Sequence, residues 1–197
     1  MRKFTEAVVK RGNIIPIGET KIDGYDVPLG WLILAVTEGR ALVVSEKVLS
    51  FRKPYGNAQH DKAWESNYYT NFNYRWSESD ICRYLNNNFV DEYKLDEVEI
   101  LSVPHRTDGN SIVPTENTAE KVFLLSSGEA DKYFRTGITR NAKALHGEAC
   151  SWALRTPSTK GAFHISGVTE AGSVTEAAGA VSSPVGIRPA FWFKVSD

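Results

Sequence analysis

Two apolar segments near the N-terminus constrain the fold of this chain more than any other feature. Residues 30–36 read Gly-Trp-Leu-Ile-Leu-Ala-Val and residues 40–45 read Arg-Ala-Leu-Val-Val-Ser, with Glu38 and Gly39 between them. Apolar, β-branched-rich runs on either side of a glycine-containing turn predict a β-hairpin. Because both runs are apolar nearly throughout, we expect central strands that are covered on both faces.

A helix is predicted in the middle of the chain. Ser77 or Ser79 can accept a hydrogen bond from a free backbone N–H at its start. Apolar side chains then recur every fourth position, at Ile81, Leu85 and Phe89, which is the spacing of one helix face. A second short helix is expected near residues 95–101.

The rest of the chain alternates between loops, one more helix and short strands. Residues 103–120 read as a polar loop, and residues 122–125 as a buried strand or the entry to a helix. Ser126 and Glu129 have the spacing of a capping box, which opens a helix with Ala130, Tyr133 and Phe134 on one face. Strands are expected over residues 151–157, 163–166, 172–175 and 185–193.

The 197 residues are enough for one well-buried core and few for two. We find no repeat of fixed period and no low-complexity linker, so residues 14–197 are predicted to form a single domain. Residues 1–13 are treated as an N-terminal segment, a docking arm in the hypothesis that the chain is an assembly module.

Charge and hydropathy exclude some classes of protein. The net charge is -1 and the basic residues are scattered, so no nucleic-acid surface is expected. No apolar run has the length of a signal peptide or of a membrane span. We therefore expect a cytoplasmic protein or one assembled into a phage particle; removal of a signal sequence stays open, as does the oligomeric state.

The order of these segments resembles a bacterial family, domain of unknown function 6273. The matching pieces are Trp31 to Leu34, Ala41 to Glu46, Ser79 to Asn86, Val122 to Ser126, Tyr133 to Phe134, Trp152 to Pro157 and Gly186 to Ala190. They occur in the family's order across nearly the whole chain. Two features depart from the pattern: Ala153 follows Trp152, and the loop at residues 52–75 is long.

The end of the chain is also similar to C-type-lectin-like domains, including formylglycine-generating enzymes and the variable proteins of diversity-generating retroelements. This resemblance implies an α+β, C-type-lectin-like fold of mixed short antiparallel strands with two or three helices. Ser151-Trp152 and Gly186-Ile187-Arg188 would then bracket the binding or active face. The resemblance does not fix the ligand, because one fold hosts many functions.

No catalytic or metal-binding set is recognisable. Cys82 and Cys150 are too few for a disulfide framework; reduced buried thiols are favoured, and a single bridge stays open. A redox or copper site at these cysteines, or a nucleophilic Cys150 with His146, is disfavoured. The four histidines lack zinc-ligand spacing, so no metal and no cofactor is predicted. Calcium stays open through the oxygens of residues 108–110 and 116–117.

Binding is the function class with positive support. Residues 52–75 combine aromatic and amide side chains, the composition of a binding loop. The candidate contacts there are Trp64, Tyr68, Tyr69, Phe72 and Tyr74. A second candidate face, residues 156–183, is rich in small polar residues. Its candidate contacts are Ser158, Thr159, His164, Ser166, Glu170, Ser173 and Thr175.

The sequence therefore predicts a non-catalytic ligand-binding domain that recognises a protein or a glycan. A retroelement-diversified or phage-associated variable protein is the more specific form of this hypothesis. Arg155, Arg188, Trp152 and Trp192 are assigned to structure rather than to ligand contact. The alternatives are an enzyme on a formylglycine-generating scaffold and a structural assembly module.

Overall fold

The chain folds mainly into antiparallel β-sheets. The computed structural model describes residues 4–5, 7–54, 75–110, 113–134, 140–160, 164–180 and 184–196. Strands make up 51% of the structure and helices 17%, so β-structure dominates by about three to one. The expected α+β, C-type-lectin-like fold is therefore wrong: short helices accompany a protein that is built from strands.

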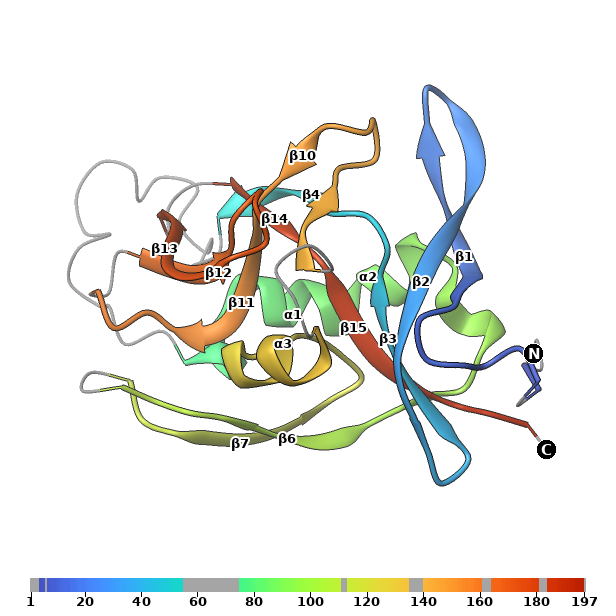
Figure 1. Cartoon of the computed structure of the whole chain (residues 1–197), viewed down its shortest axis with the longest axis horizontal. Coiled ribbons are helices and arrows are strands. Elements are labelled where there is room, and N and C mark those ends of the chain that lie inside the picture. Colours follow the sequence, from blue (N-terminus) through green and yellow to red (C-terminus); the bar gives the residue numbers. More distant parts are fainter. Residues whose placement is uncertain are drawn as a thin grey trace.

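The largest sheet is antiparallel, and its strands lie in the right-hand part of the view (Figure 1). Its strands lie in the order β1-β2-β3-β15-β5, and β8 also pairs with β15. Their bounds are Ile14–Ile22 (β1), Tyr25–Thr37 (β2), Arg40–Ser45 (β3), Ile100–Leu101 (β5), Val122–Leu124 (β8) and Pro189–Lys194 (β15). The predicted hairpin is confirmed, because β2 pairs with β3 around the turn at Glu38 and Gly39.

The structure has four smaller sheets besides the main one. Three are two-stranded and pair β4 with β14, β6 with β7 and β9 with β10, and the fourth has the order β11-β12-β13. Their bounds are Leu49–Pro54 (β4), Val103–Thr107 (β6), Glu116–Glu120 (β7), Ala142–Lys143 (β9), Ala149–Cys150 (β10), Trp152–Pro157 (β11), His164–Val168 (β12), Val174–Ala180 (β13) and Pro184–Ile187 (β14).

The helices are short. They are Trp76–Glu78 (η1, a 3₁₀ turn), Asp80–Asn87 (α1), Phe89–Glu92 (α2), Leu95–Glu97 (η2, a 3₁₀ turn) and Ser127–Tyr133 (α3). The cap at Ser79 is confirmed, because its side chain accepts the Cys82 N–H at 3.1 Å. The capping box of Ser126 and Glu129 is also confirmed. Within the described residues, no helix is long and apolar enough to cross a membrane.

The core lies between the main sheet and the helices. The side chains of β3 are buried from Ala41 to Ser45, as expected of a central strand. Trp31 packs on Phe191 with ring centroids 4.5 Å apart. The N-terminal segment takes part, since Phe4 is buried against Phe193 at 5.8 Å.

Three local predictions are corrected. Residues 103–120 are not a polar loop: β6 and β7 form a regular hairpin. The helix expected at residues 95–101 is only the 3₁₀ turn η2, and β5 follows it because Ile100 and Leu101 pair with β15. The single closing strand at residues 185–193 is two strands, β14 and β15, which belong to different sheets and meet at Arg188.

Candidate functional site

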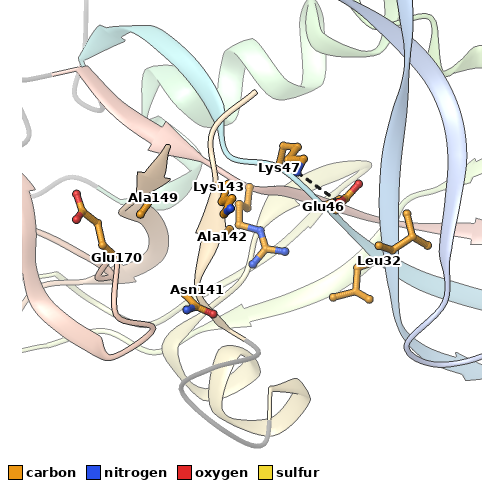
Figure 2. A pocket seen from close by; sticks show the side chains of 10 residues that line it. Leu32, Glu46, Lys47, Asn141, Ala142, Lys143, Ala149 and Glu170 are labelled. Carbon is orange, nitrogen blue, oxygen red and sulfur yellow. Dashed lines mark ion pairs between the residues drawn. The ribbon is translucent and has the colours of Figure 1, made fainter. Parts of the chain in front are cut away.

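A groove of about 330 Å³ opens between the main sheet and the β9–β10 hairpin (Figure 2). We call it the Arg188 groove. Its lining residues are Ile14, Leu32, Glu46, Lys47, Asn141, Ala142, Lys143, Ala149, Glu170 and Arg188. Leu32 and Glu46 lie on one side, Lys143 and Ala142 lie near the middle, and Ala149 and Glu170 lie on the other side (Figure 2).

Backbone hydrogen bonds hold the two walls together. The Val48 N–H, just after β3, donates to the Lys143 carbonyl at 2.9 Å, and Val48 also forms a parallel bridge with Ala144. The Ala144 N–H donates to the Glu148 carbonyl, which closes the hairpin over Gly147 at a φ of 99°. The groove is thus framed by fixed backbone rather than by side chains alone.

Arg188 is buried in the groove with only 2% of its surface exposed. Its Nε donates to the Ser45 carbonyl at 3.0 Å and its Nη1 to the Arg140 carbonyl at 3.3 Å. The guanidinium carbon lies 5.0 Å from the Trp152 ring centroid and 5.4 Å from that of Phe134. These contacts fix the plane of the guanidinium.

The charge on Arg188 has no carboxylate in contact among the described residues. Burial lowers its pKa to about 10, and the negative charge of Glu46 opposes that shift. The group therefore stays charged at neutral pH. Glu46 itself pairs with Lys47 at 3.5 Å. Removing a cation from water without a contacting anion is costly, so this arrangement marks the groove as unusual.

The sequence of this chain matches a family model described as domain of unknown function (DUF6273) over residues 38–195. The chain belongs to this family. The resemblance to it that the sequence indicated is confirmed. No curated protein and no solved structure matches the chain, so the comparisons give no support to a likeness to formylglycine-generating enzymes or to retroelement variable proteins.

The structure describes most of the second candidate face of this DUF6273 domain but none of the candidate residues of the first. Trp64, Tyr68, Tyr69, Phe72 and Tyr74 lie outside the described residues. On the second face only one candidate residue, Glu170, lines the Arg188 groove.

The other candidates of the second face are placed as follows. Ser158 is buried and donates to the Glu176 carbonyl at 2.5 Å, and Thr159 donates to the Glu176 carboxylate. Ser166 is buried, and within the described ranges its hydroxyl has no hydrogen-bond partner. His164 and Ser173 are exposed, and Thr175 is half-buried.

Sequence reasoning missed most of the groove. Lys47, Lys143 and Asn141 were not candidates, and Arg188 was assigned to structure alone. The one visible signal was an arginine inside a long apolar run, between Ile187 and Pro189.

The cysteines of the DUF6273 domain are both free, so the alternative of a bridge between them is wrong. Burial, followed by the negative charge of Glu120, raises the pKa of the Cys82 thiol to about 12. Burial also raises the pKa of Cys150. Because the thiolate is the nucleophile, both shifts disfavour the reactive form of these thiols at neutral pH.

Several of the oxygens considered for calcium make contacts within the chain. Asp108 pairs with Arg106 at 2.9 Å, and the Asn110 side chain accepts the Val113 N–H at 2.7 Å. Glu116 accepts the Ser77 hydroxyl at 2.5 Å through Oε1, and its Oε2 has no hydrogen-bond partner among the described residues. Over the described ranges, no group of three or more His, Cys, Asp or Glu side chains could hold a metal ion.

Proposed function

We propose that this DUF6273 domain is a non-catalytic ligand-binding domain that takes a protein or glycan ligand in the Arg188 groove. One observation carries the proposal: a buried, charged guanidinium lines an open groove and touches no carboxylate of the described chain. A buried cation that lacks a partner costs several kcal/mol unless an anion meets it. A ligand that brings such an anion would recover that cost on binding.

The construction of the groove supports binding. Its walls come from strands whose backbones are tied by the Val48 and Ala144 hydrogen bonds, and Arg188 is fixed by two carbonyls and two rings. A preformed site loses little conformational entropy when a ligand enters. The raised thiol pKa values of Cys82 and Cys150 favour a binding role over thiol catalysis.

The more specific proposal is a phage-associated or retroelement-diversified receptor-binding protein. Ser158 and Ser166 are buried, so substitutions at these two positions would disturb the fold. Diversification would have to concentrate at exposed positions such as Thr159, His164 and Ser173. Sequencing of this gene across a natural population should find variation there and little at Ser158 or Ser166; a uniform segment would contradict this form of the proposal.

The general proposal is tested by a binding screen with a groove-filling variant. The full chain is probed on a glycan array and against a displayed random-peptide library, and each hit is measured again with Ala149→Trp. Ala149 is exposed and lines the groove, so the indole should block binding at least tenfold while the melting temperature holds.

The matched control is Ala119→Trp, at an exposed strand position on β7, outside the groove. It should leave binding unchanged. Hits that bind Ala149→Trp and the unmodified chain equally would refute the groove as the binding site. A screen without any hit would refute the proposed function as a whole.

A further inference from the structure

We infer that the Arg188 groove binds the C-terminal carboxylate of a peptide whose last side chain is aliphatic. This inference rests on the proposed function and names the ligand class of the same site. It draws on three properties of the groove: the free donors of Arg188, the sum of the charges, and the position of the apolar side chains.

The free donors of Arg188 suit a carboxylate. A guanidinium carries five N–H donors in a rigid plane. Nε and Nη1 donate to the carbonyls of Ser45 and Arg140, and Nη2 has no acceptor among the described residues. Because Trp152 and Phe134 hold the plane, the remaining donors are oriented before a ligand arrives. A planar carboxylate is the anion that such a fork matches best.

The charges of the groove favour an anion of one negative charge. Arg188, Lys47 and Lys143 bring three positive charges, and Glu46 and Glu170 bring two negative ones. The difference, 3 − 2, is one positive charge. A phosphate dianion would leave the groove with an excess negative charge, whereas a carboxylate balances the single positive charge. Asn141 adds an amide that can donate to and accept from a neighbouring peptide bond.

The apolar side chains favour a peptide over an acidic sugar. Ile14 is 52% exposed and lines the groove with Leu32, so a ligand that covers them gains apolar burial, about 25 cal/mol for each Å². None of the described lining residues has an aromatic ring on which a sugar ring could stack. The volume of about 330 Å³ is small for a ligand pocket and suits a terminal residue rather than a folded epitope.

The experiment titrates the full chain with four probes by calorimetry: N-acetyl-leucine, N-acetyl-leucinamide, glucuronate and inorganic phosphate. We expect N-acetyl-leucine to bind at least tenfold more tightly than its amide. Equal binding of the amide would overturn the carboxylate contact. Tighter binding of glucuronate or phosphate would overturn the peptide assignment, and so would the absence of binding by all four probes at millimolar concentration.

A charge-reversal pair tests the site without disturbing Arg188, which the fold itself needs. Lys143→Glu changes the sum of the groove charges from one positive to one negative and should weaken N-acetyl-leucine at least fivefold. Lys121→Glu, at an exposed position outside the groove, is the matched control and should change the affinity less than twofold. Equal affinities of the two variants would overturn the inference.

The two proposals fail in different ways. If Ala149→Trp abolishes binding of a screened ligand while N-acetyl-leucine fails to bind, the inference is wrong and the proposed function stands. If screened ligands bind Ala149→Trp normally, the groove is not the site and both are wrong.

Discussion

His105 makes the stability of this domain depend on pH in a direction that the structure fixes. The side chain projects inward from β6 and is 6% exposed. Its ring centroid lies 3.8 Å from that of Phe123, and its Nε2 has no hydrogen-bond partner among the described residues. Burial, followed by the positive charge of Arg155, lowers the pKa of His105 from 6.5 to about 4, against an opposing effect of Glu129.

The direction of the pH dependence follows from whether the folded or the unfolded chain binds the proton more tightly. The unfolded chain takes up a proton near pH 6.5, but the folded chain does so only near pH 4. The contribution of a neutral His105 to stability is therefore complete above pH 6.5 and is lost as the pH falls through the folded pKa. With these two pKa values, the free energy of unfolding drops by about 2 kcal/mol between pH 7.5 and pH 5.

The assay is urea unfolding of the unmodified chain and of His105→Gln at pH 7.5 and pH 5. Gln keeps a polar side chain of similar size and does not titrate, so its fall in stability should be about 2 kcal/mol smaller, a difference of roughly 4–8 °C in melting temperature. Burial raises the pKa of Glu120, so protonation of this carboxyl stabilises the folded chain as the pH falls. Because Glu120 is present in both proteins, its contribution cancels when their losses of stability are compared.

The control for this comparison is His164→Gln, since His164 is exposed on β12. It should show the same fall as the unmodified chain. If the unmodified chain and His105→Gln lose equal stability between the two pH values, the reasoning about the buried imidazole is refuted.

Three further predictions follow from buried groups. Arg155→Met should cost about 3–5 kcal/mol in urea unfolding, because it removes the buried ion pair with Glu129 at 2.6 Å and the hydrogen bonds to the Leu124 carbonyl and the Thr107 hydroxyl. Gly167→Ala should lower the free energy of unfolding by at least about 2 kcal/mol, since the new Cβ would lie 2.5 Å from the Trp152 carbonyl oxygen. The control is Gly179→Ala, whose Cβ would enter open space; it should change stability by less than about 0.5 kcal/mol. Cys82 should react with iodoacetamide at pH 8 only after denaturation; rapid labelling of the native chain would contradict its raised pKa and revive the thiol-enzyme hypothesis.

Local patterns predicted the local structure well. The β2–β3 hairpin, the Ser79 cap and the capping box at Ser126 each depend on a few neighbouring residues whose preferences agree. In each case the structure forms the expected contact. Such elements can be predicted from the sequence because both partners of each interaction lie within about ten residues of each other.

The β6–β7 hairpin was missed because its inward face is polar. Every second side chain of β6 is buried, at Val103, His105 and Thr107, and the two between them are exposed. Histidine and threonine are more often found on the exposed face of a sheet. His105 and Thr107 face the interior because Arg155 comes from 48 residues away and donates to the Thr107 hydroxyl at 2.9 Å. Strands are predicted from apolar residues at alternate positions. A strand whose buried positions are polar lacks this pattern and is therefore not predicted.

The division of residues 185–193 into two strands was missed for a related reason. The apolar run at residues 185–193 has the pattern of one strand, yet Gly186 lies so close to Val48 and to the Ser151 carbonyl that a Cβ would clash with both. Close to this contact, at Arg188, the chain passes from the sheet of β14 into the sheet of β15. A change of sheet of this kind depends on neighbours that lie far away in sequence, and no local spacing reveals it.

The Arg188 groove illustrates the same limit for function. Its lining comes from strands near both ends of the chain and from the β9–β10 hairpin between them, so no motif of fixed spacing could mark it. The family match begins at residue 38, and all the charged lining residues lie after that point, whereas Ile14 and Leu32 lie before it. If the groove binds a carboxylate beside an aliphatic side chain, the charged contact belongs to the part of the chain that defines the family, and the aliphatic preference is supplied by β1 and β2, outside the match.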